Sequence, residues 1–388
     1  MLKGSRPYNA TTSYYLVNSH TISTEAGVRA KFATGSITHK VVVAGTYLDQ
    51  KSQIPTLLSP AGFTGNIYRT NNPARPALTG PNTGSSSALQ LSGIALTDTM
   101  YALNDRVQLT VGARHQEIAG QGFSLAGVQT AAYDKSKVTP SAGIVVKPLE
   151  KLSLYANYIE AFTRGPVAPV GSSNVGQIFA PIMSVSKEVG AKYDFGSIGM
   201  TLAFFDITQP AGITDPATRR FDIVGEQRNR GIEYTIFGEL KPGLRALGGV
   251  TLLDGKLEKT AGGINDGKTA FGAPDVSLTF GLDADVPYVP GFALNGRVIY
   301  TSSQFVTADN TKQIPEWTRL DLGARYAFMF DRTPMVARFN IENVMGDDYW
   351  ASSARGFLSR GAPRTFLFSL TADLNPALDA ARPAIYTK

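Results

Sequence analysis

Arg319-Leu320-Asp321-Leu322-Gly323-Ala324-Arg325-Tyr326-Ala327-Phe328 is the stretch of sequence that decides the fold. Its leucine and aromatic side chains fall on every second position, and its aspartate and arginines fall between them. A period of two residues is typical of a β-strand, whose successive side chains point to opposite faces. We therefore expect a strand with one apolar face and one polar face.

The connections around this stretch favour a membrane barrel over a soluble sandwich, which shows the same alternation. Residues 337–342 and 365–374 alternate in the same way. The first pair of strands is separated only by a turn at 331–333, whereas 346–363 form a long polar loop rich in Asp, Ser, Arg and Gly. Tight turns on one side and long loops on the other are typical of outer-membrane barrels.

The same rhythm runs through the whole chain and predicts about fifteen antiparallel strands. Long connections are expected at 49–87, 117–136, 163–183, 209–218, 260–269, 303–313 and 346–363. The outward face of 200–208 stays unassigned because Phe204 and Phe205 are adjacent, and 244–257 is equally ambiguous. The expected strands are 22–32, 37–48, 89–101, 107–116, 138–146, 152–158, 189–195, 200–208, 219–237, 244–257, 276–283, 292–301, 319–328, 337–342 and 365–374.

Composition excludes several other classes. No apolar run approaches the ~18 residues of a membrane helix, so the barrel is the remaining spanning fold. The net charge of +6 comes without a basic run or an RNA-binding aromatic motif, which argues against nucleic acid. The chain has no cysteine, and its first 18 residues hold no apolar signal segment. Either the chain is soluble, or it is a piece of something longer.

Four segments, in this order and spacing, form a specific pattern: Ser186-Lys187-Glu188-Val189-Gly190-Ala191-Lys192-Tyr193-Asp194, Gly225-Glu226-Gln227-Arg228-Asn229-Arg230-Gly231-Ile232-Glu233, Trp317-Thr318-Arg319-Leu320-Asp321-Leu322-Gly323-Ala324-Arg325-Tyr326, and Asn340-Ile341-Glu342-Asn343-Val344 with Asp348-Tyr349-Trp350-Ala351. The pattern resembles the C-terminal barrel of TonB-dependent siderophore receptors of Gram-negative outer membranes. The likeness covers nearly the whole chain.

The resemblance implies an all-β fold, an antiparallel transmembrane β-barrel of about 22 strands preceded by a plug and a TonB box. The fifteen strands here would be the eighth to the last, an incomplete barrel with two open edges and no plug or TonB box. We expect residues 1–374 to be this barrel part and 375–388 to be a C-terminal tail. Receptors of this family usually end on an aromatic residue, whereas the last strand here is expected to stop at Leu374.

The ligand of such a receptor is a ferric siderophore, bulky and often anionic, which suits aromatic and guanidinium groups in the long loops. The alternative is that the aromatic residues form the interfacial girdle and the arginines meet lipopolysaccharide phosphates. Lumen-facing arginines at 297, 319, 325 and 338 are expected to pair with lumen carboxylates and plug groups. The candidate ligand-binding residues are Tyr68, Arg69, Arg164, Phe179, Tyr349, Trp350, Arg355 and Arg360.

Catalytic and metal chemistry are not expected. The histidines at 20, 39 and 115 have no metal-ligand spacing and are expected to be wall residues. Asp347-Asp348 is more typical of a turn than of a calcium site, although calcium stays possible there. No nucleophile motif or phosphate-binding glycine motif follows a strand. The chain is therefore not expected to be an enzyme.

The resulting interpretation is an outer-membrane receptor that takes up ferric siderophores, represented by a part that is not transport-competent alone. Its expected partners are the siderophore as transported ligand, outer-membrane lipid and lipopolysaccharide, and TonB in the complete receptor only. Two alternatives stay open. One is a passive porin-like or adhesive outer-membrane barrel, and the other is a soluble all-β binding protein. The identity of the siderophore, or of another nutrient such as a cobalamin, is not predicted.

Overall fold

A computed structural model describes residues 7–10, 13–15, 17–54, 56–58, 63–66, 85–124, 127–169, 171–215, 217–331, 333–354 and 357–374. Within these residues, no helix is long and apolar enough to cross a membrane. The expected tail at 375–388 lies outside the described residues.

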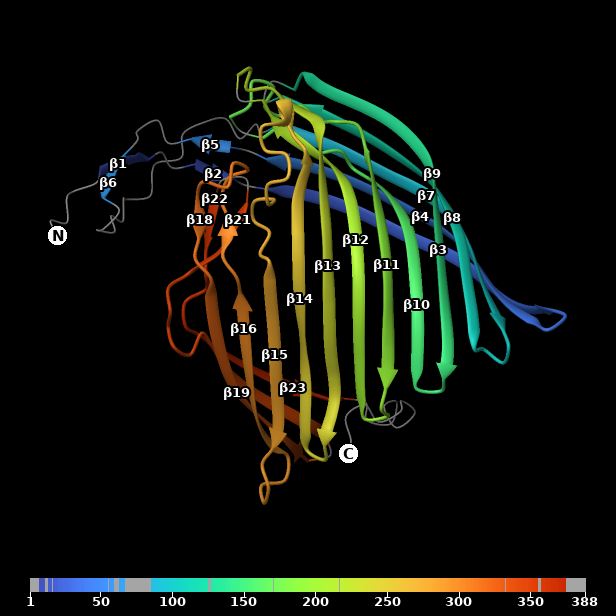
Figure 1. The fold of residues 1–388 in the computed structure, drawn as a ribbon. Helices are drawn as coiled ribbons and strands as arrows, with labels where there is room; N and C mark the ends of the chain where they lie inside the picture. The colour runs from blue at the N-terminus through green and yellow to red at the C-terminus, as the bar shows by residue number, and fades with distance from the viewer. Residues whose placement is uncertain are drawn as a thin grey trace.

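One antiparallel sheet dominates the described structure, and its strands follow one another in chain order (Figure 1). It has fifteen strands, which confirms the predicted number, and β3 and β23 are its two edge strands. The strands are β3 Asn18–Thr34, β4 Ile37–Ile54, β7 Ser85–Ala102, β8 Val107–Phe123, β9 Gln129–Leu149, β10 Leu152–Thr163, β11 Ile182–Asp194, β12 Ile198–Thr214, β13 Phe221–Lys241, β14 Leu244–Lys259, β15 Val276–Asp285, β16 Phe292–Thr301, β19 Trp317–Phe330, β20 Thr333–Glu342 and β23 Thr365–Ala372.

Smaller elements lie outside the fifteen-stranded sheet, mostly in the connections between its strands. Four two-stranded ribbons pair short strands, and one 3-10 turn, η1 Ala261–Gly263, follows β14. The ribbons are β1 Pro7–Ala10 with β6 Phe63–Asn66, β2 Ser13–Tyr15 with β5 Thr56–Leu58, β17 Gln304–Phe305 with β18 Gln313–Ile314, and β21 Trp350–Ala354 with β22 Phe357–Arg360.

The two ends of the sheet differ, as the sequence predicts (Figure 1). At one, the turn end, neighbouring strands are joined by short turns, from 35–36 to the longest at 286–291. At the other, the loop end, most connections are longer, such as 164–181 and 343–364. The turn end uses left-handed backbone, with φ of 57° at Asn104 and 62° at Gly35. Asparagine and glycine tolerate this conformation better than other residues.

Strand register separates the sheet into an apolar face and a polar face. Val189 lies opposite Phe204, Phe204 opposite Ile232, and Ile232 opposite Leu252. Directly opposite residues share a face, so the apolar face runs without a break across β11 to β14. This register resolves both strands whose phase the sequence leaves open. Phe204 belongs to the apolar face, and Phe205 belongs to the polar face.

Glycines on the polar face leave room for aromatic rings of the next strand. Phe205 lies opposite Gly231, and a Cβ added to Gly231 would lie 2.4 Å from the Phe205 ring. Tyr155 lies opposite Gly190 in the same way, with 2.6 Å between the added Cβ and the ring. Such aromatic–glycine pairs cover backbone that glycine would expose, and they help to fix register.

The expected loop at 117–136 is wrong, and those at 49–87 and 209–218 begin too early, because strands continue into them. Residues 117–136 are mostly strand, since β8 runs to Phe123 and β9 starts at Gln129. β4 extends to Ile54 and β12 to Thr214. The ladder persists where the apolar alternation has faded, because ladder hydrogen bonds join backbone groups and do not need an apolar face. A small core is formed by Leu89 of β7, Ile118 of β8 and Phe162 of β10, with Leu91, Tyr133 and Met183 packed against it.

Candidate functional site

Asn174 fastens the loop 164–181 to the start of β13. Its Nδ2 donates to the Phe221 carbonyl at 2.8 Å, and its Oδ1 accepts from the Phe221 amide at 2.9 Å. Arg219 adds a second link, because its Nη2 donates to the Gly171 carbonyl at 2.9 Å. The loops 164–181 and 215–220 therefore form one unit.

This unit holds two of the predicted ligand residues, Arg164 and Phe179. Phe179 packs edge-on against Phe221, with 5.4 Å between the ring centroids. Arg164 is half-buried beside Tyr133, whose hydroxyl is buried and makes no well-formed hydrogen bond among the described residues. An aromatic pair, a guanidinium and a tyrosine thus lie within one connected group of elements. Such a set can bind an anionic ligand with a flat surface.

Asp215 stabilises 215–220, the second loop of this unit, and does not itself belong to a strand. Its carboxylate accepts from the backbone amides of Thr218 at 2.8 Å and Ala217 at 2.9 Å. These bonds, that of Thr218 first, hold the pKa of the Asp215 carboxyl below its usual range. The ionised carboxylate therefore supports the turn that leads to Arg219.

A second group contains the predicted residues Tyr349, Trp350 and Arg360. Tyr349 stacks on Trp317 of β19 at 4.5 Å, and the Trp317 indole donates to the Ala351 carbonyl at 3.3 Å. Arg360 donates to Asp348 at 2.8 Å, so that aspartate serves the loop as a polar anchor. Trp350 is exposed. The predicted set thus divides between two places, one beside β9 and β13 and the other beside β19.

The remaining predicted ligand residues, Tyr68, Arg69 and Arg355, lie outside the described residues. Sequence reasoning missed Asn343, which organises the second group and is 1% exposed. Its side chain donates to the carbonyls of Asp347 at 2.9 Å and Ala362 at 3.1 Å, which bridges both ends of the loop. The available signal was an asparagine directly after a strand. Its hydrogen-bond partners could not be predicted from the sequence, because Ala362 lies far along the chain.

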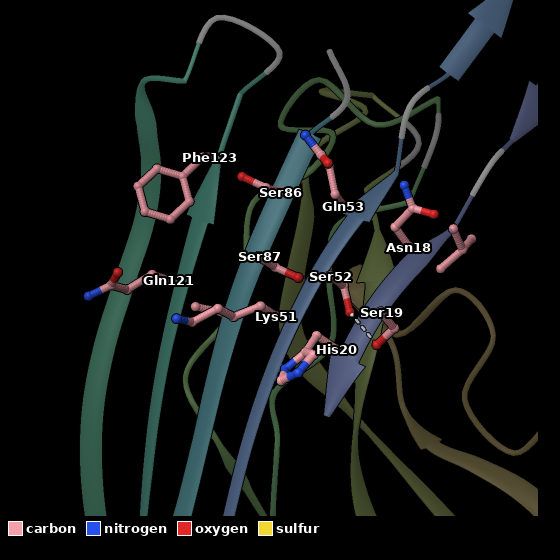
Figure 2. A pocket seen from close by; sticks show the side chains of 12 residues that line it. Asn18, Ser19, His20, Lys51, Ser52, Gln53, Ser86, Ser87, Gln121 and Phe123 are labelled. Atoms are coloured by element: carbon pink, nitrogen blue, oxygen red, sulfur yellow. Dashed lines mark hydrogen bonds between the residues drawn. The ribbon is translucent and has the colours of Figure 1, made fainter. Parts of the chain in front are cut away.

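A polar groove of about 770 Å³ lies at the loop end of β3, β4, β7 and β8 (Figure 2). Serines and amides line most of it, with Ser19 and Ser52 hydrogen bonded at 3.2 Å. Lys51 and Phe123 contribute a cation and an aromatic ring. The sequence signal was the polar composition of 50–53 and 85–87 on both faces of their strands. Hydroxyl, amide and ammonium groups at the rim can hydrogen bond an oxygen-rich ligand.

On the polar face, arginines pair with carboxylates of neighbouring strands, as predicted for Arg297 and Arg319. Arg297 lies 2.7 Å from Asp321, and Arg319 lies 2.9 Å from the same carboxylate. Asp321 also accepts from the Asn343 amide at 2.9 Å. The cluster therefore connects strands β16 and β19 to Asn343, the residue that organises the second group.

A further polar-face cluster lies nearer the turn end. Arg325 lies 3.1 Å from Asp283 and 2.8 Å from Asp285, which confirms that it pairs with carboxylates. Arg245 binds the same two carboxylates, a role missed because the phase of its strand was unassigned. Arg338 donates to the Thr371 hydroxyl at 3.4 Å. Both clusters present charges that largely neutralise each other.

The histidines lie in strands, which confirms that they are wall residues. His39 shares hydrogen bonds of 2.7 Å with Thr34 and with Asp98, and His20 and His115 belong to β3 and β8. Among the described residues, no group of three or more His, Asp or Glu is placed to hold a metal ion.

Comparison with known proteins identifies the sheet. The profile of the family described as "TonB dependent receptor-like, beta-barrel" matches residues 2–344. The chain belongs to the TonB-dependent receptor β-barrel family. It is 40% identical over 367 residues to the ferrichrome receptor FcuA of Yersinia enterocolitica, across 89% of this chain and 47% of that protein.

Structures of TonB-dependent receptors agree with this assignment. The ferric preacinetobactin receptor BauA of Acinetobacter baumannii superposes with a TM-score of 0.81 and 35% identity, over 94% of this chain and 55% of that one. The siderophore receptor PiuA of the same species superposes with a TM-score of 0.73 at 20% identity, which shows the fold alone. This chain spans about half the length of the relatives it matches.

Family membership places this TonB-dependent receptor barrel in the outer membrane and outside the enzymes. The soluble alternative is thereby wrong. In an outer-membrane barrel the apolar face meets lipid, the turn end is periplasmic and the loop end is extracellular. Both groups of candidate residues and the polar groove therefore lie at the extracellular end of the sheet.

Proposed function

We propose that this barrel serves the uptake of ferric siderophores and that its extracellular loops bind the ligand. The observation that carries the proposal is the unit formed by loops 164–181 and 215–220, where Arg164 lies beside Tyr133 of β9 and Phe179 packs against Phe221 at the start of β13. The relatives named above as a ferrichrome receptor and a ferric preacinetobactin receptor support the same class of ligand.

Tyr68, Arg69 and Arg355 remain part of the proposed binding surface, beside Tyr349, Trp350 and Arg360. In the complete receptor, a plug and TonB would supply the energised step, and the barrel would supply capture and the lumen. We expect this chain alone to bind but not to transport.

The two tryptophans of the chain make a direct test possible. Trp317 and Trp350 both belong to the second group of candidate residues, so a ligand bound there should quench the fluorescence of the protein. We expect saturable quenching when the detergent-solubilised chain is titrated with ferrichrome or a ferric catecholate, and little with the iron-free compounds. Arg360→Gln and Arg164→Gln should each weaken binding several-fold, with Arg338→Gln as a control on the lumen face.

A passive porin-like or adhesive barrel predicts a different result. Quenching would then be absent, or would rise linearly with ligand without saturating. Either result with a folded, heat-modifiable protein would overturn the proposal.

A further inference from the structure

The turn that joins β15 to β16 presents a fully exposed aromatic ring at the periplasmic end of the barrel. This turn reaches beyond its neighbours at the bottom of the view (Figure 1), and its Tyr288 has a relative exposure of 101%. Phe292 and Tyr326 lie opposite each other on the apolar face, at the level where barrels gather aromatic residues at the membrane interface. Because Phe292 begins β16 and Tyr288 precedes it, Tyr288 lies beyond this interface, in the periplasm.

The backbone of Tyr288 is left-handed, a conformation that a bulky side chain disfavours. A hydrogen bond of 3.3 Å from the Val289 amide closes a β-turn in which Tyr288 is the second central residue, with φ of 70°. The next turn, closed by the Phe292 amide at 3.1 Å, has Gly291 in the same position with φ of 81°. Such positions favour glycine or asparagine. One loop thus uses glycine in one turn and a strained tyrosine in the other, and strain of this kind gathers at functional sites.

The neighbouring side chains extend the exposed ring into an apolar surface. A backbone hydrogen bond of 2.8 Å joins the turn to the end of β19. There Met329 and Phe330 are both more than half exposed, and Val289 in the turn is nearly half exposed. Aromatic residues and methionine are enriched in the cores of protein–protein interfaces. Tyr288, Val289, Met329 and Phe330 are called the periplasmic tip below.

The charges next to the periplasmic tip are neutralised on the lumen face. Asp283 and Asp285, which end β15 just before the turn, pair with Arg245 and Arg325. Residues 286–291 carry no polar side chain other than the Tyr288 hydroxyl, so they offer little to a cell-wall glycan, which binds through many hydrogen bonds. The periplasmic tip is therefore an apolar, uncharged projection at the rim of the lumen, suited to an apolar pocket on a protein.

We propose that the periplasmic tip docks a soluble periplasmic carrier protein, which takes over the ferric siderophore as it leaves the lumen. This inference rests on the proposed function, because a siderophore released at this rim enters water and must be bound by a further protein. The ring of Tyr288 is the anchor that fills an apolar pocket of the carrier. Two turns give only a small contact area, and small interfaces are transient. A transient contact suits a carrier that must leave with its ligand.

The test uses a carrier that is isolated by its own ligand. Periplasmic extract of the bacterium that encodes this chain is passed over the immobilised ferric siderophore that quenches the fluorescence of the barrel, and the retained protein is purified. Its binding to the detergent-solubilised full chain is then measured by surface plasmon resonance. Tyr288→Gly should bind the carrier about 30-fold more weakly than wild type, as is typical when an interface loses an aromatic anchor. Tyr288→Phe keeps the ring and should bind like wild type.

Leu103 offers a matched control at the same end of the barrel. It is exposed and left-handed, with φ of 52°, but it belongs to the turn between β7 and β8, on the far side of β9 to β14. Leu103→Gly should bind the carrier like wild type. Glycine accepts both backbone conformations without strain, so neither glycine variant should lower the urea midpoint of the barrel. Wild-type binding by Tyr288→Gly, or an equal loss in Leu103→Gly, would overturn the docking site.

Tryptophan quenching separates this inference from the proposed function. Trp317 and Trp350 lie at the loop end, so siderophore binding there should be unchanged in every variant. Saturable quenching without carrier binding would overturn the docking site alone. Absence of quenching by every ferric siderophore would overturn the proposed function, and the assignment to a carrier would fall with it. If soluble peptidoglycan fragments bind wild type but not Tyr288→Gly, the periplasmic tip contacts the cell wall and the carrier proposal is wrong.

Discussion

Asn174 holds two extracellular loops together with one carboxamide. It satisfies both the amide and the carbonyl of Phe221, a residue that is 7% exposed. Asn174→Ala should leave these groups without partners, a loss of about 1–3 kcal/mol confined to the loops. We expect faster amide hydrogen exchange in 164–181 and 215–221 but an unchanged unfolding midpoint of the barrel.

Asn310 offers a matched control, because it clamps Thr269 with the same geometry, 2.8 Å from its Nδ2 to the carbonyl and 2.9 Å from the amide to its Oδ1. Asn310→Ala should accelerate exchange in 260–275 and 306–312 only. If both variants loosen the same segments, the loops are not independent pairs.

Asp215 gives the loop unit a pH dependence. Its pKa is lowered in the folded protein, first by the Thr218 amide, so its ionised form favours the ordered loop. The contribution is complete above the unfolded carboxyl pKa of about 3.9 and is lost as the pH falls through the lowered folded value. We expect exchange in 215–221 to accelerate below about pH 4 in wild type, after correction for the intrinsic rate. Asp215→Asn should remove this acid-dependent step, and a step that persists in the variant would assign it to another group.

At the level of elements, the aromatic–glycine pairs make a specific prediction. A Cβ at position 231 would lie 2.5 Å from the Leu252 carbonyl as well as against the Phe205 ring, so backbone must move. Gly231→Ala should destabilise the barrel by about 1–3 kcal/mol. Gly45→Ala is the control, because its nearest atom would be the Ala26 carbonyl at 3.9 Å. The comparison uses urea midpoints of refolded protein in detergent, and equal midpoints would refute the packing argument.

The strands themselves were largely predictable from sequence, because each one must alternate where it faces lipid. Their extracellular extensions were not, since the ladder of 117–123 with 129–136 needs no apolar face. Half of the candidate site could likewise not be predicted from the sequence. Arg164 and Phe179 stood out by type, but the Asn174 clamp depends on Phe221, and nothing between them in the chain marks that contact.

At the scale of the whole molecule, the continuous apolar face means that the stability cost of a substitution depends more on which face the residue lies on than on the residue type. Leu202 lies on that face opposite Ala191, and Thr201 next to it lies on the polar face opposite Lys192. Leu202→Arg should cost about 2–4 kcal/mol of stability in a bilayer, whereas Thr201→Arg should cost much less. Urea titration in short-chain lipid vesicles measures both, and similar losses would contradict the assigned faces.

The paired clamps at Asn174 and Asn310 also bear on how such receptors diversify. A loop that is bound to a neighbouring loop through backbone groups cannot change length alone. The shift would displace the residue that it holds in the neighbouring segment, Phe221 for Asn174 and Thr269 for Asn310. Recombination between related genes would therefore preserve recognition only when both loops of a pair are inherited together. An antibody or bacteriophage that targets this surface would likewise meet a composite epitope drawn from two distant parts of the gene.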